Sequence, residues 1–211
     1  KFFLEQIEYR QENPGDDLIS FLLDAELDGE PVPMPVIRGN VGLMLIAGID
    51  TTWSSIGSAL LHLATNPEDR QRLVDEPDLI PTAIEEFLRA YSPVTMARVA
   101  NHDTMLGDRE VKAGDRVMLT FPAANRDPAM FDNPEEVIID REHNRHIAFG
   151  SGIHRCAGSN LARMEMQVAI EEFLKMIPEF ELTDADAVTW AGGQVRGPRN
   201  IPVTFPIRHP L

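Results

Sequence analysis

The stretch from residue 149 to residue 158 holds the chain's one cysteine, Cys156, in a loop rich in glycine. A helical pattern of apolar residues begins just after it, at about Asn160. The sulfur should therefore face a helix N-terminus, where unpaired N–H groups and the helix dipole favour negative charge. Such surroundings stabilise the thiolate, the form of cysteine that acts as a nucleophile or a metal ligand.

Four interpretations of Cys156 are open from the residue types alone. The simplest is a small buried side chain without a chemical role, which is common for a lone cysteine. The others are a catalytic nucleophile with His146 or His154 as its base, a zinc ligand together with His143, His146 and His154, and the axial ligand of a haem iron.

The glycines of this loop help to choose between these interpretations. Gly150, Gly152 and Gly158 let the backbone turn sharply and approach a flat, bulky group closely. They do not form a dinucleotide-binding fingerprint, because the spacing lacks the third glycine of a Rossmann turn and no strand-like run leads into it. The glycines therefore favour the haem interpretation.

The pattern F-x-x-G-x-H-x-C-x-G, read as Phe149, Gly152, His154, Cys156 and Gly158, resembles the cysteine-ligand loop of the cytochrome P-450 family of haem-thiolate monooxygenases. The resemblance implies that Cys156 is the axial ligand of haem b (iron protoporphyrin IX). Its electron release would favour O–O cleavage in dioxygen, the co-substrate. Phe149 would pack near the sulfur side of the haem, and His154 would reach a haem propionate. The implied haem-contacting glycines are Gly150, Gly152 and Gly158.

A long helical segment at residues 36–64 is apolar on most of its circumference. A helix of this kind belongs in the middle of a domain. Polar Asp50 and Thr51 interrupt it directly after the small residues Ala47 and Gly48. One interpretation is structural: Thr51 bonds back to a carbonyl one turn earlier, and Asp50 meets a basic residue elsewhere.

The other interpretation rests on the family resemblance, because residues 47–52 resemble the oxygen-activation segment of the P-450 central helix. The resemblance implies that Ala47 and Gly48 open a groove over the haem for dioxygen. Asp50 and Thr51 would then be the acid–alcohol pair that guides protons to the bound oxygen. A carboxylate, a hydroxyl and water can relay protons in a dry pocket.

Glu86 and Arg89, three residues apart on a predicted helix at 81–91, would usually form a surface pair worth ~0.3 kcal/mol. They also resemble the E-x-x-R pair of the P-450 family, a buried ion pair behind the cysteine loop. The family's third partner, an arginine shortly before that loop, falls on Arg141, with Arg126 and Arg145 as rivals. The resemblance implies a structural role for this triad: it fixes the loop that presents Cys156.

Several further residues are implied by the same resemblance to line the substrate pocket or to hold the haem. Arg98 matches a second propionate clamp, which suits the affinity of arginine for carboxylates; a solvated surface charge is the alternative. The implied pocket residues come from the long helix, from the extended run after residue 91 and from a turn near residue 194. They are Ile46, Val94, Thr95, Met96, Gln194 and Val195.

The composition bounds the class of protein. A chain of 211 residues suffices for one substantial core or two small ones. The net charge of −15 argues against nucleic acid as a partner. One cysteine excludes an internal disulfide framework. No run of 18 apolar residues predicts a membrane span, and nothing at Lys1 resembles a signal peptide. The motifs resemble soluble bacterial members of the family, which predicts a cytoplasmic location.

The predicted fold is mainly α with small antiparallel β-sheets, and the resemblance implies the C-terminal, haem-binding half of the P-450 fold. Residues 1–211 would be one part of a single domain whose N-terminal half is absent from this chain. The predicted helices are residues 1–12, 16–23 (capped by Asp16), 36–64, 67–74, 81–91 and 160–176. Short strands with turns at Gly107 and Gly114 are expected within 94–120, and 180–182 should pair with 201–205. An ordered meander is expected at 121–134. Residues 28–31 should break the chain, and the prolines up to residue 35 should keep it extended.

The predicted activity is the insertion of one oxygen atom into a small apolar organic substrate. Electrons must come from outside, because the chain has no flavin motif and one cysteine cannot hold an iron–sulfur cluster. The expected partner is a ferredoxin or flavodoxin-like donor with its reductase. Basic residues around the cysteine segment form a possible docking patch, with a solvated helix face as the alternative. They are Arg145, Arg155, Arg163 and Lys175.

Overall fold

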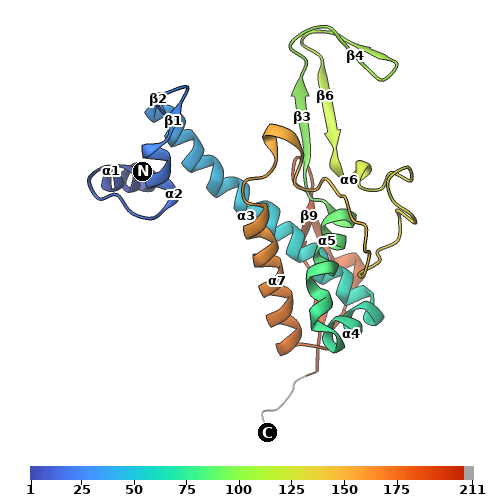
Figure 1. The fold of residues 1–211 in the computed structure, drawn as a ribbon. Coiled ribbons are helices and arrows are strands. Elements are labelled where there is room, and N and C mark those ends of the chain that lie inside the picture. Colours follow the sequence, from blue (N-terminus) through green and yellow to red (C-terminus); the bar gives the residue numbers. More distant parts are fainter. Residues whose placement is uncertain (207–211) are drawn as a thin grey trace. The chain divides into compact units, whose positions relative to one another are not determined.

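The computed structural model describes residues 1–206 and is built mainly of helices with small antiparallel sheets, as predicted (Figure 1). The α-helices are α1 (Phe2–Glu12), α2 (Leu18–Asp24), α3 (Met34–Thr65), α4 (Pro67–Asp75), α5 (Ile80–Tyr91), α6 (Phe121–Ala124) and α7 (Ser159–Met176). The strands are β1 (Glu26–Leu27), β2 (Glu30–Pro31), β3 (Thr95–Val99), β4 (Thr104–Leu106), β5 (Arg109–Val111), β6 (Arg116–Thr120), β7 (Glu181–Leu182), β8 (Thr189–Ala191), β9 (Gly197–Asn200) and β10 (Val203–Thr204).

The chain divides into two compact units, Lys1–Asp50 and Thr51–Leu211. In the first unit, α1, α2 and the beginning of α3 share a small core around Ile7, Ile37 and Val41. The cap of α2 differs from the prediction by one residue. Asp17, in extended conformation, accepts a hydrogen bond from the Ser20 N–H at 3.0 Å, which satisfies an otherwise unpaired donor of the first turn.

A small hairpin stands where the sequence predicted only a break and an extended, proline-rich run. Strands β1 and β2 pair through a two-residue turn at Asp28 and Gly29, whose φ angles are 55° and 82°. Positive φ at both central residues is the geometry of a type I′ turn, which Asp-Gly favours. Pro35 lies inside the first turn of α3, where the missing N–H of proline costs no hydrogen bond.

Helix α3 spans 32 residues, within two residues of its predicted bounds, but its first part is not buried as expected. Large apolar side chains are exposed there and in the following turn; they are Leu43, Met44, Leu45, Ile46, Ile49 and Trp53. The part of α3 in the second unit does carry buried side chains, among them Ala59 and Leu63. The expected central position therefore holds only for this second part, where α5 and α7 supply a core.

The core of the second unit joins the end of α3 to α5 and α7. Ile84 and Phe87 of α5 and Met166 and Ile170 of α7 are almost fully buried against Leu63. Each such side chain contributes about 1.5–3 kcal/mol through loss of contact with water. The bounds of α4, α5 and α7 lie within a residue or two of the predicted ones, because apolar residues at helical spacing and the first-turn prolines mark them.

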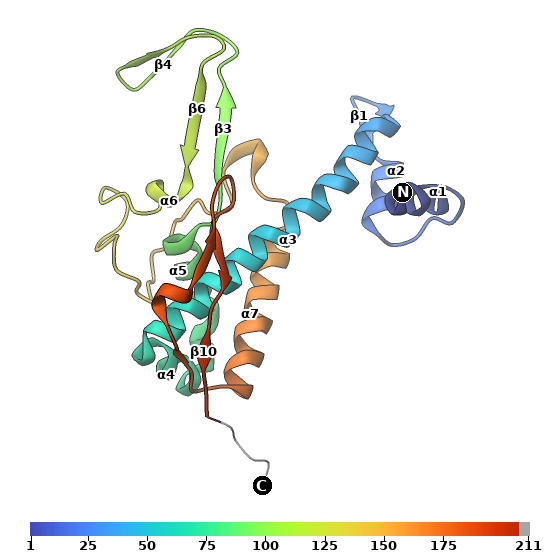
Figure 2. The same cartoon turned by 180° about the vertical axis from the view of Figure 1, so that it is seen from behind.

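The sheets are two-stranded and antiparallel. Strand β3 pairs with β6, and β4 pairs with β5 across a turn at Gly107, where φ is +60°. The predicted strands and turns between residues 94 and 120 are thus confirmed. The predicted late pairing is also present, since β7 and β10 join Leu182 to Val203. These C-terminal strands, in red, face the viewer in Figure 2.

Two findings complete the fold. The meander expected at 121–134 begins with the short helix α6 and is otherwise made of turns and bends. Among the residues that the structure describes, no helix combines the length and the apolar character needed to cross a bilayer.

Candidate functional site

The cysteine loop, residues 149–158, closes on itself just before α7. The Cys156 N–H donates to the Phe149 carbonyl at 2.9 Å, and a single 3₁₀ turn at Gly152–His154 fills the bend. The thiol of Cys156 is free and the residue is exposed, which removes the interpretation of this cysteine as a buried core side chain.

Two glycines give the loop its shape. Gly150 and Gly152 have φ angles of +70° and +68°, a region that other residues rarely adopt. A Cβ on Gly150 would lie 3.6 Å from the His154 carbonyl oxygen, whereas a Cβ on Gly152 would meet nothing within 4 Å. The loop therefore presents an open backbone surface beside an exposed sulfur.

These residues fit the haem that the sequence predicts. A haem-thiolate site needs one sulfur ligand, a backbone that leaves room for a flat ring and polar groups for the propionates. The loop offers exposed Cys156 as its only sulfur, the open surface at Gly152 and exposed His154. Ile153, 98% exposed, adds an apolar side chain to the same surface.

The zinc alternative is wrong, because one of its ligands is already engaged at both ring nitrogens. His146 Nδ1 accepts from the Ala148 N–H at 3.2 Å, and Nε2 lies 3.0 Å from a carboxylate oxygen of Glu85. Within residues 1–206, no group of three or more histidine, cysteine or acidic side chains is placed to hold a metal ion. The same contacts leave His146 unsuited as the base of a cysteine hydrolase.

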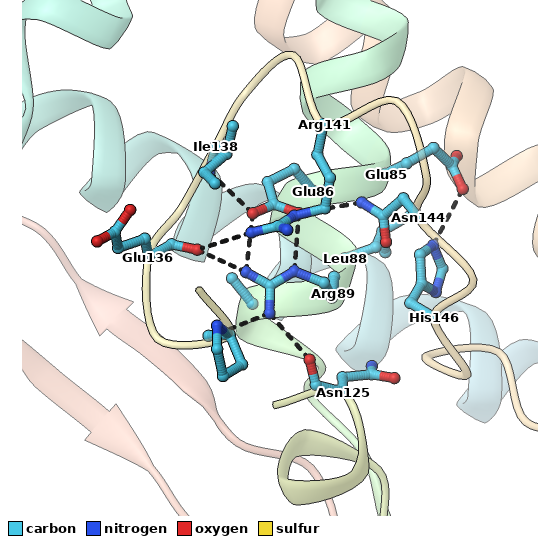
Figure 3. Close-up of polar contacts among 12 residues, drawn as sticks. Glu85, Glu86, Leu88, Arg89, Asn125, Glu136, Ile138, Arg141, Asn144 and His146 are labelled. Carbon is cyan, nitrogen blue, oxygen red and sulfur yellow. Dashed lines mark hydrogen bonds and ion pairs between the residues drawn. The ribbon is translucent and has the colours of Figure 1, made fainter. Parts of the chain in front are cut away.

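Behind the cysteine loop, Glu86 lies at the centre of a buried polar network (Figure 3). Arg89 donates to its two carboxylate oxygens at 2.8 Å each, and Arg141 donates to Oε2 at 3.0 Å. Of the three arginines considered as third partner, Arg141 makes this contact. Arg126 instead pairs with Glu135.

The network also holds the chain segment that leads to the loop. Glu86 accepts hydrogen bonds from the Ile138 N–H at 2.8 Å and from Asn144 Nδ2 at 3.0 Å. Arg89 donates to the carbonyls of Asn125, Pro134 and Glu136. Burial works against the charge of Glu86, but the hydrogen bonds from Arg89 and the Ile138 N–H outweigh it and lower the pKa of this carboxyl.

A second carboxylate, which the sequence did not single out, lies next to the first. Glu85 accepts from Arg163 at 2.5 and 2.9 Å and from His146 at 3.0 Å. Burial raises its pKa, but hydrogen bonds from His146 and Arg163 outweigh this and lower the pKa to about 2. The sequence signal was the adjacent pair of glutamates on α5, which must point in different directions.

This contact changes the interpretation of the basic patch. Arg163 was expected on a docking surface, yet its charge is balanced by Glu85, and Lys175 is paired with Glu172 at 2.7 Å. Arg145 and Arg155 are exposed. Two of the four predicted docking residues are thus neutralised within the chain.

The residues of the predicted oxygen-activation segment lie within α3, at the boundary of the two units. Ala47, Gly48 and Asp50 belong to the first unit and Thr51 to the second. Ala47 and Gly48 are exposed, while Asp50 and Thr51 are partly buried. Their role in proton delivery stays a prediction.

Five of the six predicted pocket residues come together in the second unit. Val94 forms a β-bridge with Val195, and the Thr95 N–H donates to the Gln194 carbonyl at 2.9 Å. Gln194 Nε2 lies 3.1 Å from Met96 Sδ.

Two residues of the predicted pocket and haem set remain: Ile46, the sixth pocket residue, and Arg98, the predicted propionate clamp. Ile46 belongs to the first unit and is 72% exposed. Arg98, on β3, is partly buried and donates to its neighbour's carbonyl at 2.9 Å.

This chain is similar to known proteins of one family over almost its whole length. A family model described as Cytochrome P450 matches residues 1–187. Cytochrome P450-terp from a Pseudomonas species is 39% identical over 197 residues, which cover 93% of this chain and 46% of that protein. Steroid C26-monooxygenase from Mycolicibacterium smegmatis is 37% identical over 207 residues, which cover 97% of this chain and 52% of that protein.

Solved structures give the same result. The structure of the polyketide synthase cytochrome P450 PksS from Bacillus subtilis superposes with a TM-score of 0.90 at 38% identity, covering 97% of this chain and 54% of that chain. The chain therefore spans about half the length of the relatives it matches. Since the family model covers most of the sequence and the fold agrees throughout, the chain belongs to the cytochrome P450 family.

Proposed function

We propose that this chain is the C-terminal, haem-binding part of a haem-thiolate monooxygenase that hydroxylates a small apolar organic substrate. The observation that carries the proposal is the exposed Cys156, held on an open glycine loop at the start of a helix, in a chain of the cytochrome P450 family. Relatives that include Steroid C26-monooxygenase are named as monooxygenases.

Haem b is the proposed cofactor, and when bound it supplies an iron that activates dioxygen. Cys156 would hold it through the sulfur, and Gly152 would let the loop approach it. His154 and Arg98 would donate to its carboxylates, as a histidine and an arginine do to anionic partners. Phe149 would shield the sulfur from water on the side where its ring packs under Arg163.

Asp50 and Thr51 are the proposed proton-handling pair. A carboxylate accepts a proton from water and passes it on, and a neighbouring hydroxyl can orient the receiving water. The small residues Ala47 and Gly48, one turn earlier on α3, leave room beside this pair. Their proposed role is to admit dioxygen and water.

The proposed substrate is small and apolar. The residues assigned to the pocket are mostly apolar, with Thr95 and Gln194 as the polar ones, a composition typical of sites that bind apolar molecules through shape. The complete list is Ile46, Val94, Thr95, Met96, Gln194 and Val195. The name of the Mycolicibacterium relative states a steroid, an apolar molecule, which supports this class.

The proposed electron source is a ferredoxin or flavodoxin-like protein with its reductase, and the proposed location is the cytoplasm. Exposed Arg145 and Arg155 remain as candidates to meet an acidic donor. Reversal of the Arg155 charge should slow the first electron transfer. The dependence of this rate on salt concentration should not become steeper, and the haem content of the protein should not change. An unchanged rate would remove Arg155 from the docking surface.

The decisive experiment is the absorbance of the haem-loaded protein. A thiolate-ligated haem gives a reduced carbon-monoxide complex that absorbs at unusually long wavelength. Replacement of Cys156 by Ala should abolish that band, whereas Ser151→Ala, in the same loop, should retain it. A parent protein that takes up no haem, or one whose band survives Cys156→Ala, would contradict the proposed function.

A further inference from the structure

Glu85 joins the two ends of the cysteine loop. One of its partners, His146, lies three residues before the loop begins at Phe149, and the other, Arg163, lies seven residues after Cys156. Both bind the same carboxylate, from α5. Glu86, the neighbouring residue, holds only the chain segment before the loop. Glu85 therefore has a different function in the fold from that of its neighbour.

The two partners of Glu85 also contact the aromatic side chain of the loop. The Arg163 guanidinium lies 4.5 Å from the centroid of the Phe149 ring, within the range of a cation–π interaction. The His146 ring centroid lies 6.2 Å from the same ring. Because Phe149 also accepts the N–H of Cys156 on its carbonyl, displacement of its ring would be felt at the cysteine.

The charges of this cluster, formed by Glu85, His146 and Arg163, are balanced. His146 Nδ1 accepts the Ala148 N–H, so Nε2 is the ring nitrogen that donates to Glu85. The charges of Glu85 and Arg163 then cancel. The hydrogen bond to Glu85 raises the pKa of Arg163 against the effect of burial, and attraction by Glu85 and by Cys156 adds to this rise. The Arg163 cation lies over the ring of Phe149, the residue whose carbonyl accepts the Cys156 N–H, so its charge lies at the cysteine loop.

We propose that Glu85 is a positioning residue that closes the base of the cysteine loop and offsets the Arg163 charge held over Phe149 of that loop, thereby setting the electron-donating strength of the sulfur. This proposal rests on the proposed function, because it concerns a sulfur that ligates iron. An unbalanced cation near the ligand stabilises an added electron and raises the reduction potential. An unbalanced carboxylate does the opposite.

The test uses paired neutralisations in the haem-loaded protein, with the reduction potential as the readout. Glu85→Gln leaves Arg163 unbalanced, and the potential should rise. Arg163→Gln leaves Glu85 unbalanced, and the potential should fall. The double variant should return toward the parent value. Shifts of the same sign in both single variants, or no shift, would overturn the proposal, since simple loosening of the loop has no reason to give opposite signs.

A matched control lies on α7, the helix that carries Arg163. Glu172→Gln breaks the exposed ion pair with Lys175, whose side chains are 59% and 65% exposed, and should leave the potential unchanged. Arg163→Lys keeps the charge but loses the two-pronged contact with Glu85, so the potential should stay near that of the parent. A shift in Arg163→Lys as large as that in Arg163→Gln would also overturn the assignment.

Hydrogen exchange of the protein without haem tests the loop-closing role separately. The Cys156 amide, bonded to the Phe149 carbonyl, should exchange faster in Glu85→Gln than in the parent, and Glu172→Gln should match the parent. Equal exchange in all three would refute loop closure. Failure of the parent to bind haem would instead refute the proposed function, and this exchange measurement would still decide whether Glu85 closes the loop.

Discussion

Glu86→Gln is the most informative single substitution in the buried network, because it removes one negative charge and keeps the size of the side chain. The side chains of Glu86 and Arg89 are 0% exposed, and that of Arg141 is 8% exposed. The carboxylate accepts hydrogen bonds from both arginines, from Asn144 and from the Ile138 N–H. A glutamine offers only one acceptor oxygen and turns an N–H group toward these donors.

The expected loss of stability follows from this arrangement. Two buried or nearly buried cations would keep their charge without the carboxylate that balances it, and breaking such a pair costs about 3–5 kcal/mol. For a chain of this size, each kcal/mol lowers the melting temperature by about 2–4 °C. Glu86→Gln should therefore melt roughly 6–20 °C below the parent.

The assay is thermal and urea unfolding at pH 7, followed by circular dichroism. Glu76→Gln is the matched control, because Glu76 makes a 3.4 Å ion pair with Arg72 and its side chain is 59% exposed. Exposed pairs contribute about 0–1 kcal/mol, so this control should lie close to the parent. A Glu86→Gln variant no less stable than Glu76→Gln would refute the view that an ionised Glu86 holds the network together.

Three further predictions concern other parts of the chain. Thr51→Ala should retain haem but release the supplied electrons as hydrogen peroxide rather than in product; the ratio of product to electrons consumed measures this, with Thr52→Ala as the comparison. Gly197→Ala should destabilise by about 1–3 kcal/mol, because its Cβ would lie 2.4 Å from the Cβ and 2.8 Å from the Cα of Ser54 on α3. The pKa of Glu85 is lowered from 4.5 to about 2, so the ionised carboxylate stabilises the fold above about pH 4.5, and this contribution is lost as the pH falls toward 2. Its contribution is at most about 3 kcal/mol, reduced by solvent screening, and Glu85→Gln should flatten the acid limb of a stability–pH curve.

Controls separate each prediction from general damage. Gly192→Ala, where a Cβ would meet nothing within 4 Å, should be tolerated if the cost at Gly197 is steric. Tight coupling of electrons to product in the Thr51 variant would argue against its role in proton delivery. An acid limb equally steep with and without the Glu85 carboxylate would show that other groups dominate acid unfolding.

The local structure of this chain was largely predictable from the sequence. The bounds of α5 and α7 follow from apolar residues at helical spacing, and the turn at Gly107 follows from the need for positive φ. The hairpin at Asp28 and Gly29 carried an equally clear signal that the sequence interpretation passed over. Such features depend on residues adjacent in the chain, so their physical cause is visible in the sequence.

The contacts of charged residues were not predictable in the same way. Arg163 looked like part of a docking surface, and His146 like a metal ligand, until the fold brought both to Glu85, more than 60 residues away in the sequence. The partner of a charged side chain depends on which surfaces pack together, and the spacing of residues along the chain does not predict this packing.

The sequence by itself determined the chemistry that this chain can offer: one cysteine in a glycine loop, an acid and an alcohol in an apolar helix, and a glutamate three residues before an arginine. Only the tertiary structure decided that Arg141 rather than Arg126 binds Glu86, and that adjacent glutamates hold different segments of the chain. The reason is that residue types fix what a side chain can do, whereas long-range packing decides which partner it meets and how much water surrounds it.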